Sequence, residues 1–243
     1  MKSLILAGGK GTRFAEETKS KPKPLIEINK VPMLIHIIDH YINFDVEEFV
    51  ILGGYKYEMI VDYFQNFCIK NKNGEFEYKN SKVLVLDTGE ETMTGGRVKQ
   101  AIEELKLSNF FLTYGDGISN VDISKLYECH KLSSCLTTLT AVRPPARFGS
   151  LELKNEKVIA FNEKKQSNEG WINGGFFILN NEVKKYIQND NQAFEKEPLT
   201  NLSNEGELVA YKHHGLFRPV DTIRELEILE SELKENEFNF SNG

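Results

Sequence analysis

The stretch Ser3–Leu25, SLILAGGKGTRFAEETKSKPKPL, joins a short apolar run to a glycine loop and then to a basic, proline-broken segment. The apolar run Leu4–Ala7 predicts a strand that is buried in a parallel sheet. Glycines directly after such a strand let the backbone approach a ligand closely, and their consecutive N–H groups form a concave nest for anions. Arg13 and the lysines from Lys19 to Lys23 add positive charge beside that nest. The stretch therefore predicts a site for a polyanion of the size of a nucleoside triphosphate.

Two common glycine-loop motifs do not fit this stretch. The dinucleotide fingerprint G-x-G-x-x-G fails because Phe14 stands where the third glycine belongs, and no Walker A run G-x-x-x-x-G-K-[ST] occurs. The alternative is a plain strand-to-helix turn, whose glycines serve only backbone geometry. We disfavour that interpretation because Thr12, Arg13 and Lys23 accompany the glycines, and a turn alone does not need them.

Length and composition are those of an ordinary globular protein. The 243 residues are 40% hydrophobic and 27% charged, which suits one large α/β domain or two small ones. A net charge of −6 argues against a nucleic-acid partner. Three cysteines without C-x-x-C spacing indicate reduced thiols. No apolar run approaches the roughly 18 residues of a membrane span or resembles a signal peptide, so we expect a cytoplasmic protein with no membrane partner.

The first half of the chain alternates predicted strands and helices. The strands are expected at Leu4–Ala7, Phe49–Leu52, Val83–Leu86 and Phe110–Tyr114, and the helices at Pro32–Ile38, at Glu58–Phe67 and from Thr94 onward. Asn71–Asn80 reads as a loop or an irregular hairpin. This alternation is typical of the doubly wound α/β fold, whose ligands bind beyond the carboxyl ends of the strands.

The second half is richer in strands. These are expected at Cys135–Val142, Lys157–Asn162, Gly174–Leu179 and Glu207–Tyr211, with helices starting near Glu197 and after Thr222. No linker, charge block or repeat divides the chain. We therefore predict one domain over residues 1–243, with a nucleotide-binding half over about 1–134 and an acceptor-binding half over about 135–243.

Asp116 stands between two glycines at the end of the strand predicted at Phe110–Tyr114. A carboxylate there could hold Mg²⁺, which favours one or two carboxylates plus phosphate oxygens, and Asp221 is a candidate second ligand. From the residues of the Gly-Asp-Gly turn alone, a turn-forming role for Asp116 is favoured.

A series of sequence blocks along nearly the whole chain resembles the sugar-phosphate nucleotidyltransferases, and most of all the glucose-1-phosphate cytidylyltransferases. The blocks, in order, are LAGGKGTR at 6–13, KPKPL at 21–25, TGGR at 94–97, TYGDG at 113–117, RFG at 147–149, EK at 163–164, INGGFF at 172–177, EPL at 197–199, GEL at 206–208 and P-x-D-T-x-R at 219–224. Any one block is weak evidence, whereas the ordered series is specific.

The resemblance implies transfer of a cytidylyl group from CTP to a sugar 1-phosphate, most of all α-D-glucose 1-phosphate, giving CDP-glucose and pyrophosphate with Mg²⁺ as cofactor. It also implies a Rossmann-like, doubly wound mixed α/β sheet of the nucleotide-diphospho-sugar transferase type, with a small β-rich acceptor-binding half. A homo-oligomer and a place in polysaccharide biosynthesis are further expectations. Such chemistry needs no general base, because the attacking phosphate oxygen is already ionised, but it needs cations and N–H groups around the reacting phosphates.

The resemblance also assigns residues. It places the nucleotide on Leu6, Gly8, Gly9, Gly11, Thr12, Arg13, Lys23, Gly95 and Arg97, the acceptor on Gly149, Glu163, Lys164 and Asn173, and Mg²⁺ on Asp116 and Asp221. Arg13 and Lys23 are the implied catalytic residues: Arg13 stabilises the leaving pyrophosphate, and Lys23 neutralises charge on the α-phosphate. On the residues themselves, we expect Thr94–Gly96 to open a helix with N–H groups directed at the ligand.

Alternatives remain open at this stage. The same transfer could use another phosphorylated acceptor, or UTP or dTTP. A non-catalytic nucleotide-binding regulator has no need for both Asp116 and Asp221, and an NAD-dependent dehydrogenase would need the missing third glycine. Two departures from the family pattern stand near the acceptor blocks. Lys165 follows the EK pair, and Trp171 replaces a smaller side chain, so that it could narrow the pocket or stack on a sugar.

Overall fold

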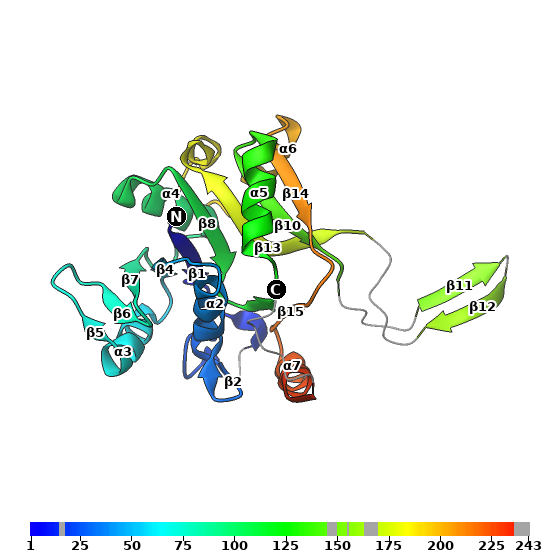
Figure 1. The fold of residues 1–243 in the computed structure, drawn as a ribbon, viewed down its shortest axis with the longest axis horizontal. Coiled ribbons are helices and arrows are strands. Elements are labelled where there is room, and N and C mark those ends of the chain that lie inside the picture. The colour runs from blue at the N-terminus through cyan, green and yellow to red at the C-terminus, as the bar shows by residue number, and fades with distance from the viewer. Residues whose placement is uncertain (15–17, 145–149, 155, 163–169, 236–243) are drawn as a thin grey trace.

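One nine-stranded mixed sheet runs through the protein, in the strand order β14-β10-β13-β8-β1-β4-β7-β6-β5 (Figure 1). The computed structural model describes residues 1–14, 18–144, 150–154, 156–162 and 170–235. The strands of this sheet are β1 (Ser3–Ala7), β4 (Glu48–Gly53), β5 (Ile69–Lys70), β6 (Phe76–Tyr78), β7 (Ser81–Asp87), β8 (Asn109–Tyr114), β10 (Thr137–Val142), β13 (Ile172–Asn180) and β14 (Leu208–Lys212).

Helices and three small two-stranded sheets complete the described chain. The α-helices are α2 (Met33–Ile42), α3 (Tyr57–Phe67), α4 (Thr94–Leu105), α5 (Ile123–Ser133), α6 (Glu197–Asn204) and α7 (Ile223–Glu235), and 3-10 helices span Thr12–Phe14, Lys23–Leu25 and Asn181–Tyr186. The small sheets pair β2 (Glu27–Ile28) with β3 (Val31–Pro32), β9 (Gly117–Ser119) with β15 (Phe217–Pro219), and β11 (Ser150–Lys154) with β12 (Lys157–Asn162). No helix in the described ranges is long and apolar enough to cross a membrane.

The parallel centre of the sheet is buried on both faces, which explains why its strands read as continuous apolar runs. Alternate residues of β1 point to opposite faces. Ile5 belongs to a core cluster that includes side chains of α2, α3, α5 and α7, whereas Leu4 and Leu6 belong to a second cluster that includes side chains of α4 and α6. The sheet is therefore doubly wound, as expected.

The elements predicted for both halves are confirmed, including the helix that opens at Thr94 and the strand predicted at Gly174–Leu179, which is the central part of β13. Asn71–Asn80 forms part of an irregular hairpin, because β6 pairs antiparallel with both β5 and β7. The sequence analysis missed α5, which buries only Ile123, Leu126 and His130, so its helical spacing of apolar residues is weak. It also missed β11, the partner of β12 in a hairpin that extends away from the body in Figure 1.

Six strands of the large sheet run in the same direction, so their carboxyl ends lie at one edge of the sheet. β1, β4, β7 and β8 are mutually parallel, β13 runs antiparallel between β8 and β10, and β14 is parallel to β10. The carboxyl ends of β10 and β14 therefore lie at the same edge as those of β1 and β8. This edge collects residues from both halves of the chain.

His40 is buried in α2 among the rings of Tyr41, Phe44 and Phe176. Its Nε2 lies 2.9 Å from the carbonyl oxygen of Val121, so that the neutral ring donates to this oxygen. Burial lowers the pKa of His40 from 6.5 to about 4, although the Val121 contact acts in the opposite direction. The folded protein therefore keeps His40 neutral at pH values where the unfolded chain binds a proton.

We expect the free energy of unfolding to fall as the pH drops from the unfolded pKa of 6.5 towards the folded pKa of about 4. His40 alone should account for about 2 kcal/mol between pH 7 and pH 5. His40→Gln, which keeps a donor for Val121, should reduce this slope in urea unfolding curves. In the variant, a smaller dependence of the unfolding free energy on pH should remain, since burial lowers the pKa values of His130 and His213 as well. An unchanged slope in the variant would contradict this assignment.

Candidate active site

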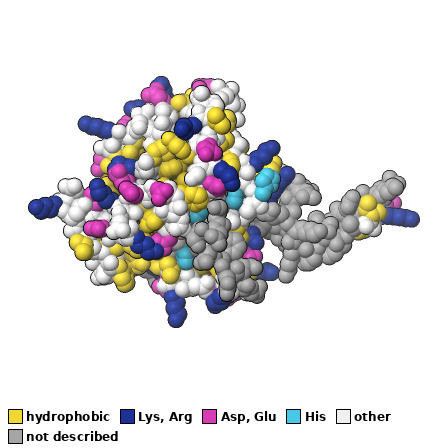
Figure 2. Space-filling model, in the orientation of Figure 1, with side chains coloured by type: hydrophobic (Ala, Val, Ile, Leu, Met, Phe, Trp, Pro, Cys, Tyr) yellow, Lys and Arg dark blue, Asp and Glu magenta, His cyan; other side chains and the backbone are white. Residues whose placement is uncertain are grey.

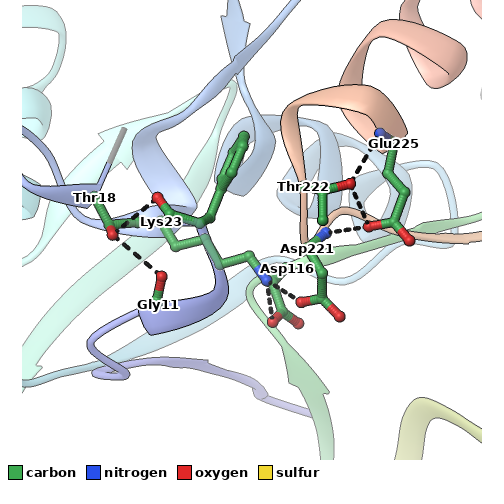
Figure 3. A network of polar contacts seen from close by, with 8 residues as sticks. Gly11, Thr18, Lys23, Asp116, Asp221, Thr222 and Glu225 are labelled. Carbon is green, nitrogen blue, oxygen red and sulfur yellow. Dashed lines mark hydrogen bonds and ion pairs between the residues drawn. The ribbon is translucent and has the colours of Figure 1, made fainter. Parts of the chain in front are cut away.

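The Lys23 ammonium lies between two carboxylates at the sheet edge (Figure 3). Its Nζ is 2.8 Å from Oδ2 of Asp116 and 2.7 Å from Oδ1 of Asp221. Lys23 itself is only 7% exposed, whereas the Asp116 side chain is 39% exposed. The structure thus brings together the implied catalytic lysine and both candidate metal ligands, from positions up to 198 residues apart in the chain.

The β9–β15 ribbon places the two carboxylates. Gly117, directly after Asp116, pairs with Pro219, and the N–H of Val220 donates to the carbonyl oxygen of Asp116 at 3.1 Å. The backbone N–H of Asp221 donates to the carboxylate of Glu225 in the first turn of α7, at 2.9 Å. Asp221 is therefore held from two sides, by the ribbon and by the start of a helix.

Arg97 ties together the carboxyl ends of three parallel strands. Its guanidinium donates to the carbonyl oxygens of Gly53 at 2.6 Å and Gly8 at 3.1 Å, and also to the hydroxyl of Thr88. The side chain comes from α4 and Arg97 is only 3% exposed. Burial lowers the pKa of Arg97, and the charge of Asp87 acts in the opposite direction. Arg97 thus fixes the carboxyl ends of β1, β4 and β7 relative to one another.

Two positions of the loop after β1 require glycine for different reasons. A Cβ on Gly8 would lie 2.1 Å from Cζ of Arg97, so only glycine leaves room for the guanidinium. Gly11 has a φ of +60°, a conformation that side chains disfavour. By contrast, a Cβ on Gly9 would have no heavy atom within 4 Å. Gly8 therefore serves the packing of Arg97, whereas Gly9 is exposed beside the pocket.

Two pockets meet at the side chains of Asp116 and Asp221. The first, of about 430 Å³, is lined by the loop 6–12, by Lys23 and Pro24, by residues 90–94 and by Arg97, Tyr114, Asp116 and Asp221. The second, of about 410 Å³, is lined by Thr94, Thr113, Tyr114, Asp116, Gly117, residues 173–176, Glu195, Phe217, Pro219 and Asp221. We call them the glycine-loop pocket and the Asn173 pocket. They share Thr94, Tyr114, Asp116 and Asp221, so their occupants would meet at the two carboxylates.

Most nucleotide residues proposed from the sequence line the glycine-loop pocket: Leu6, Gly8, Gly9, Gly11, Thr12, Lys23 and Arg97. Gly95 is not among the described lining residues, and its N–H donates to the carbonyl oxygen of Gln192 at 3.0 Å instead of pointing to a ligand. Arg13 lies in the 3-10 helix Thr12–Phe14, where the structure describes its backbone only.

The acceptor residues proposed from the sequence are described only in part. Asn173 lines its pocket, and its Nδ2 donates to the hydroxyl of Tyr114 at 3.3 Å. Gly149, Glu163 and Lys164 lie outside the described residues.

Sequence reasoning missed several lining residues. Glu90 and Glu91 both pair with Lys10, which links the loop after β7 to the glycine loop. Tyr114 lines both pockets, and its pKa is raised first by burial and then by the neighbouring Glu195 carboxylate. Tyr114 directly precedes the Gly-Asp-Gly turn, a position that could have identified it, whereas nothing in the sequence around Glu195 marks that residue.

We expect Gly8→Ala to lower the free energy of unfolding by more than about 2 kcal/mol, because its Cβ displaces the buried Arg97 guanidinium. Gly9→Ala is the matched control and should stay within about 0.5 kcal/mol. Urea unfolding of both variants checks this. Equal stability losses would show that the loop does not depend on Arg97.

Known proteins resemble this chain along most of its length. The glucose-1-phosphate cytidylyltransferase of Salmonella typhimurium is 41% identical to this chain, and the matched residues make up 95% of each of the two proteins. The D-glycero-alpha-D-manno-heptose 1-phosphate guanylyltransferase of Aneurinibacillus thermoaerophilus is 33% identical, over 75% of this chain and 76% of its own.

Solved structures agree with the fold. HddC from Yersinia pseudotuberculosis, complexed with GMP-PN, has a TM-score of 0.74 and 25% identity, over 96% of this chain and 99% of its own. A UDP-glucose pyrophosphorylase complexed with UDP-glucose has a TM-score of 0.71 at 15% identity, covers 96% and 98% of the two chains, and supports the fold alone. The family described as Nucleotidyl transferase matches residues 2–214. On this evidence, the chain belongs to the nucleotidyl transferase family.

Proposed function

We propose that this chain transfers a cytidylyl group from CTP to α-D-glucose 1-phosphate and so forms CDP-glucose and pyrophosphate. The observation that carries the proposal is the meeting of two pockets at Lys23, Asp116 and Asp221. The choice of CTP and glucose 1-phosphate rests on the similarity to proteins named glucose-1-phosphate cytidylyltransferase, since CTP is the usual donor of a cytidylyl group.

The glycine-loop pocket suits the triphosphate and the Asn173 pocket suits the acceptor. In the reaction, a phosphate oxygen of the acceptor attacks the α-phosphorus of CTP, and the bond from that phosphorus to the oxygen bridging to the β-phosphorus breaks. The electron pair leaves with pyrophosphate. Because the attacking oxygen is already ionised, the site needs to hold two polyanions together rather than remove a proton. Lys23 is the described cation closest to both carboxylates, and it can neutralise charge on the α-phosphate.

The donor set at the sheet edge fits Mg²⁺. Asp116 and Asp221 each place one oxygen within 2.8 Å of the same ammonium nitrogen, so both can face one cation. No group of three or more His, Cys, Asp or Glu side chains gathers within the described ranges, so phosphate oxygens would have to complete the coordination. When bound, Mg²⁺ supplies positive charge that stabilises the triphosphate during transfer.

Lys23 stands where a cation between the carboxylates would stand. For Asp116 and Asp221 to hold Mg²⁺ between them, the Lys23 ammonium would have to leave that space and turn towards the phosphates. The triphosphate offers Lys23 a new anionic partner, which offsets the loss of its two carboxylate contacts.

Lys23→Met should therefore bind Mg²⁺ about tenfold more tightly than the native chain in the absence of nucleotide, because two carboxylates lose their internal cation. Isothermal titration with MgCl₂ measures this, and circular dichroism checks that the variant folds. Equal Mg²⁺ affinity in the two folded proteins would contradict the competition between Lys23 and the metal.

Asp221→Asn should lower pyrophosphate release from CTP and glucose 1-phosphate by about two orders of magnitude or more, because one metal-binding carboxylate is lost. Asp39→Asn is the control, since Asp39 lies on α2, pairs with Lys79 and lines neither pocket. Unchanged turnover in Asp221→Asn would rule out the metal assignment.

The substrate pair is tested by pyrophosphate release with four nucleoside triphosphates and a panel of phosphorylated acceptors. Release confined to CTP and glucose 1-phosphate is the expected result. Pyrophosphate release with CTP and another acceptor would support the same mechanism with a different substrate. No pyrophosphate release with any pair in the panel would favour a nucleotide-binding regulator. We extend the proposal to a homo-oligomer that serves polysaccharide synthesis, on the sequence resemblance alone, and to a cytoplasmic location, on the composition and apolar patterning of the sequence.

A further inference from the structure

Lys10 forms ion pairs with two glutamates in the wall of the glycine-loop pocket. Its Nζ lies 2.6 Å from Oε1 of Glu91 and 3.8 Å from Oε1 of Glu90. All three residues line this pocket, Lys10 from the loop after β1 and the two glutamates from the loop after β7. A pocket that suits a triphosphate therefore has two carboxylates in its wall, and like charges repel a polyanion unless a cation faces them.

Ion pairs as such are ordinary on this protein, because acidic and basic side chains are intermixed over the face shown in Figure 2. The side chains of Lys10 and Glu91 are 44% and 80% exposed, so water and salt screen their attraction. A pair this exposed contributes little to stability. What distinguishes it is its place in the wall of the glycine-loop pocket.

The backbones of the two loops are held together independently of this pair. The buried guanidinium of Arg97 donates to the carbonyl oxygens of Gly8 at 3.1 Å and Glu90 at 3.4 Å, so that one side chain contacts both loops. The N–H of Tyr55 also donates to the carbonyl oxygen of Gly8, at 3.1 Å. The contact between Lys10 and Glu91 can therefore open while both backbones stay in place.

A triphosphate in the glycine-loop pocket offers the Lys10 ammonium a stronger partner than Glu91. Phosphate oxygens carry more negative charge than one carboxylate, and charge-assisted hydrogen bonds to phosphate are among the strong ones. A lysine has a flexible stem and rotatable donors, so its ammonium can turn from one anion to another. Glu91 is mostly exposed already, so its carboxylate returns to water at little cost.

We propose that Lys10 binds the triphosphate of the nucleotide, and that Glu91 competes with the triphosphate for its ammonium. Lys10 then adds a second lysine to the pocket besides Lys23. The competition gives Glu91 an effect opposite to that of Lys10, because its carboxylate opposes binding of the polyanion. The proposal rests on the proposed function only for the choice of a nucleotide, since inorganic tripolyphosphate tests the same contact.

Isothermal titration of the full chain with sodium tripolyphosphate, in metal-free buffer at low ionic strength, measures this contact without metal or turnover. Lys10→Gln should weaken tripolyphosphate binding about tenfold, because a charge-assisted hydrogen bond is lost. Glu91→Gln should tighten it about threefold, because Lys10 loses its competing partner and the pocket loses a like charge. The two variants should thus shift the affinity in opposite directions.

Lys125→Gln and Glu182→Gln are the matched controls. Each removes one charge from an ion pair at the surface, Lys125 with Asp122 and Glu182 with Lys185, and neither residue is among the described lining residues of the pocket. Both controls should bind tripolyphosphate as the native chain does. A control that shifts the affinity as far as its counterpart would assign the effect to net charge and overturn the proposal.

Two further results would overturn the proposal. The first is a Lys10→Gln variant, folded by circular dichroism, that binds tripolyphosphate as tightly as the native chain, or a native chain that does not bind it. The second is a Glu91→Gln variant that binds more weakly, because the pair would then hold the two loops together or Glu91 would itself contact the ligand.

Titration with CTP under the same conditions separates this contact from the proposed reaction. Opposite shifts in the two variants with CTP as well would support both the contact and the nucleotide. If tripolyphosphate gives the opposite shifts and CTP does not bind, the exchange between Glu91 and phosphate stands and the choice of CTP is wrong. If CTP binds equally to the native chain and Lys10→Gln, the nucleotide does not use Lys10 and the proposal is wrong.

Discussion

The buried contact of the Lys23 ammonium with Asp116 and Asp221 is the interaction on which the active site depends. An ammonium that is almost excluded from water is costly unless carboxylates face it. This requirement holds the 3-10 helix Lys23–Leu25, the turn after β8 and the start of α7 at one point. The two pockets meet there for the same reason, because both carboxylates contribute to each wall.

Arg97 has a comparable role beneath the glycine loop. Its guanidinium satisfies backbone carbonyls and a hydroxyl at the carboxyl ends of β1, β4 and β7, and buried carbonyls need such partners. A residue that resembles a nucleotide ligand in sequence therefore also organises the loop that would hold the nucleotide. The two buried cations have different partners: Lys23 pairs with the carboxylates of Asp116 and Asp221, whereas Arg97 donates hydrogen bonds to backbone carbonyl oxygens.

The sequence was informative where a local pattern has a single physical meaning. The central strands were predictable because strands buried on both faces are continuously apolar. The metal-binding role of Asp116 was favoured only through the family resemblance, since the Gly-Asp-Gly turn by itself indicates a turn former. The sequence was less informative for α5, whose apolar residues show little helical periodicity. It was also less informative for Gly95, because the N–H of this residue donates to the backbone carbonyl oxygen of Gln192, a contact that the sequence does not reveal. The roles of Arg13, Gly149, Glu163 and Lys164 still rest on the family resemblance.

From its residues alone, this chain could be assigned a doubly wound α/β fold and an anion-binding loop after the first strand, because each depends on neighbours in sequence. It could also be assigned a family, because an ordered series of blocks extends along nearly the whole chain. Tertiary structure alone decided that Asp221 joins Asp116 through the β9–β15 ribbon, and that Glu195 reaches the pocket beside Tyr114. It also decided that Arg143, Lys212 and Trp171 meet. The last of these contacts follows from the neighbouring positions of β13, β10 and β14 in the sheet, and the order of strands in a sheet depends on packing between segments far apart in the chain.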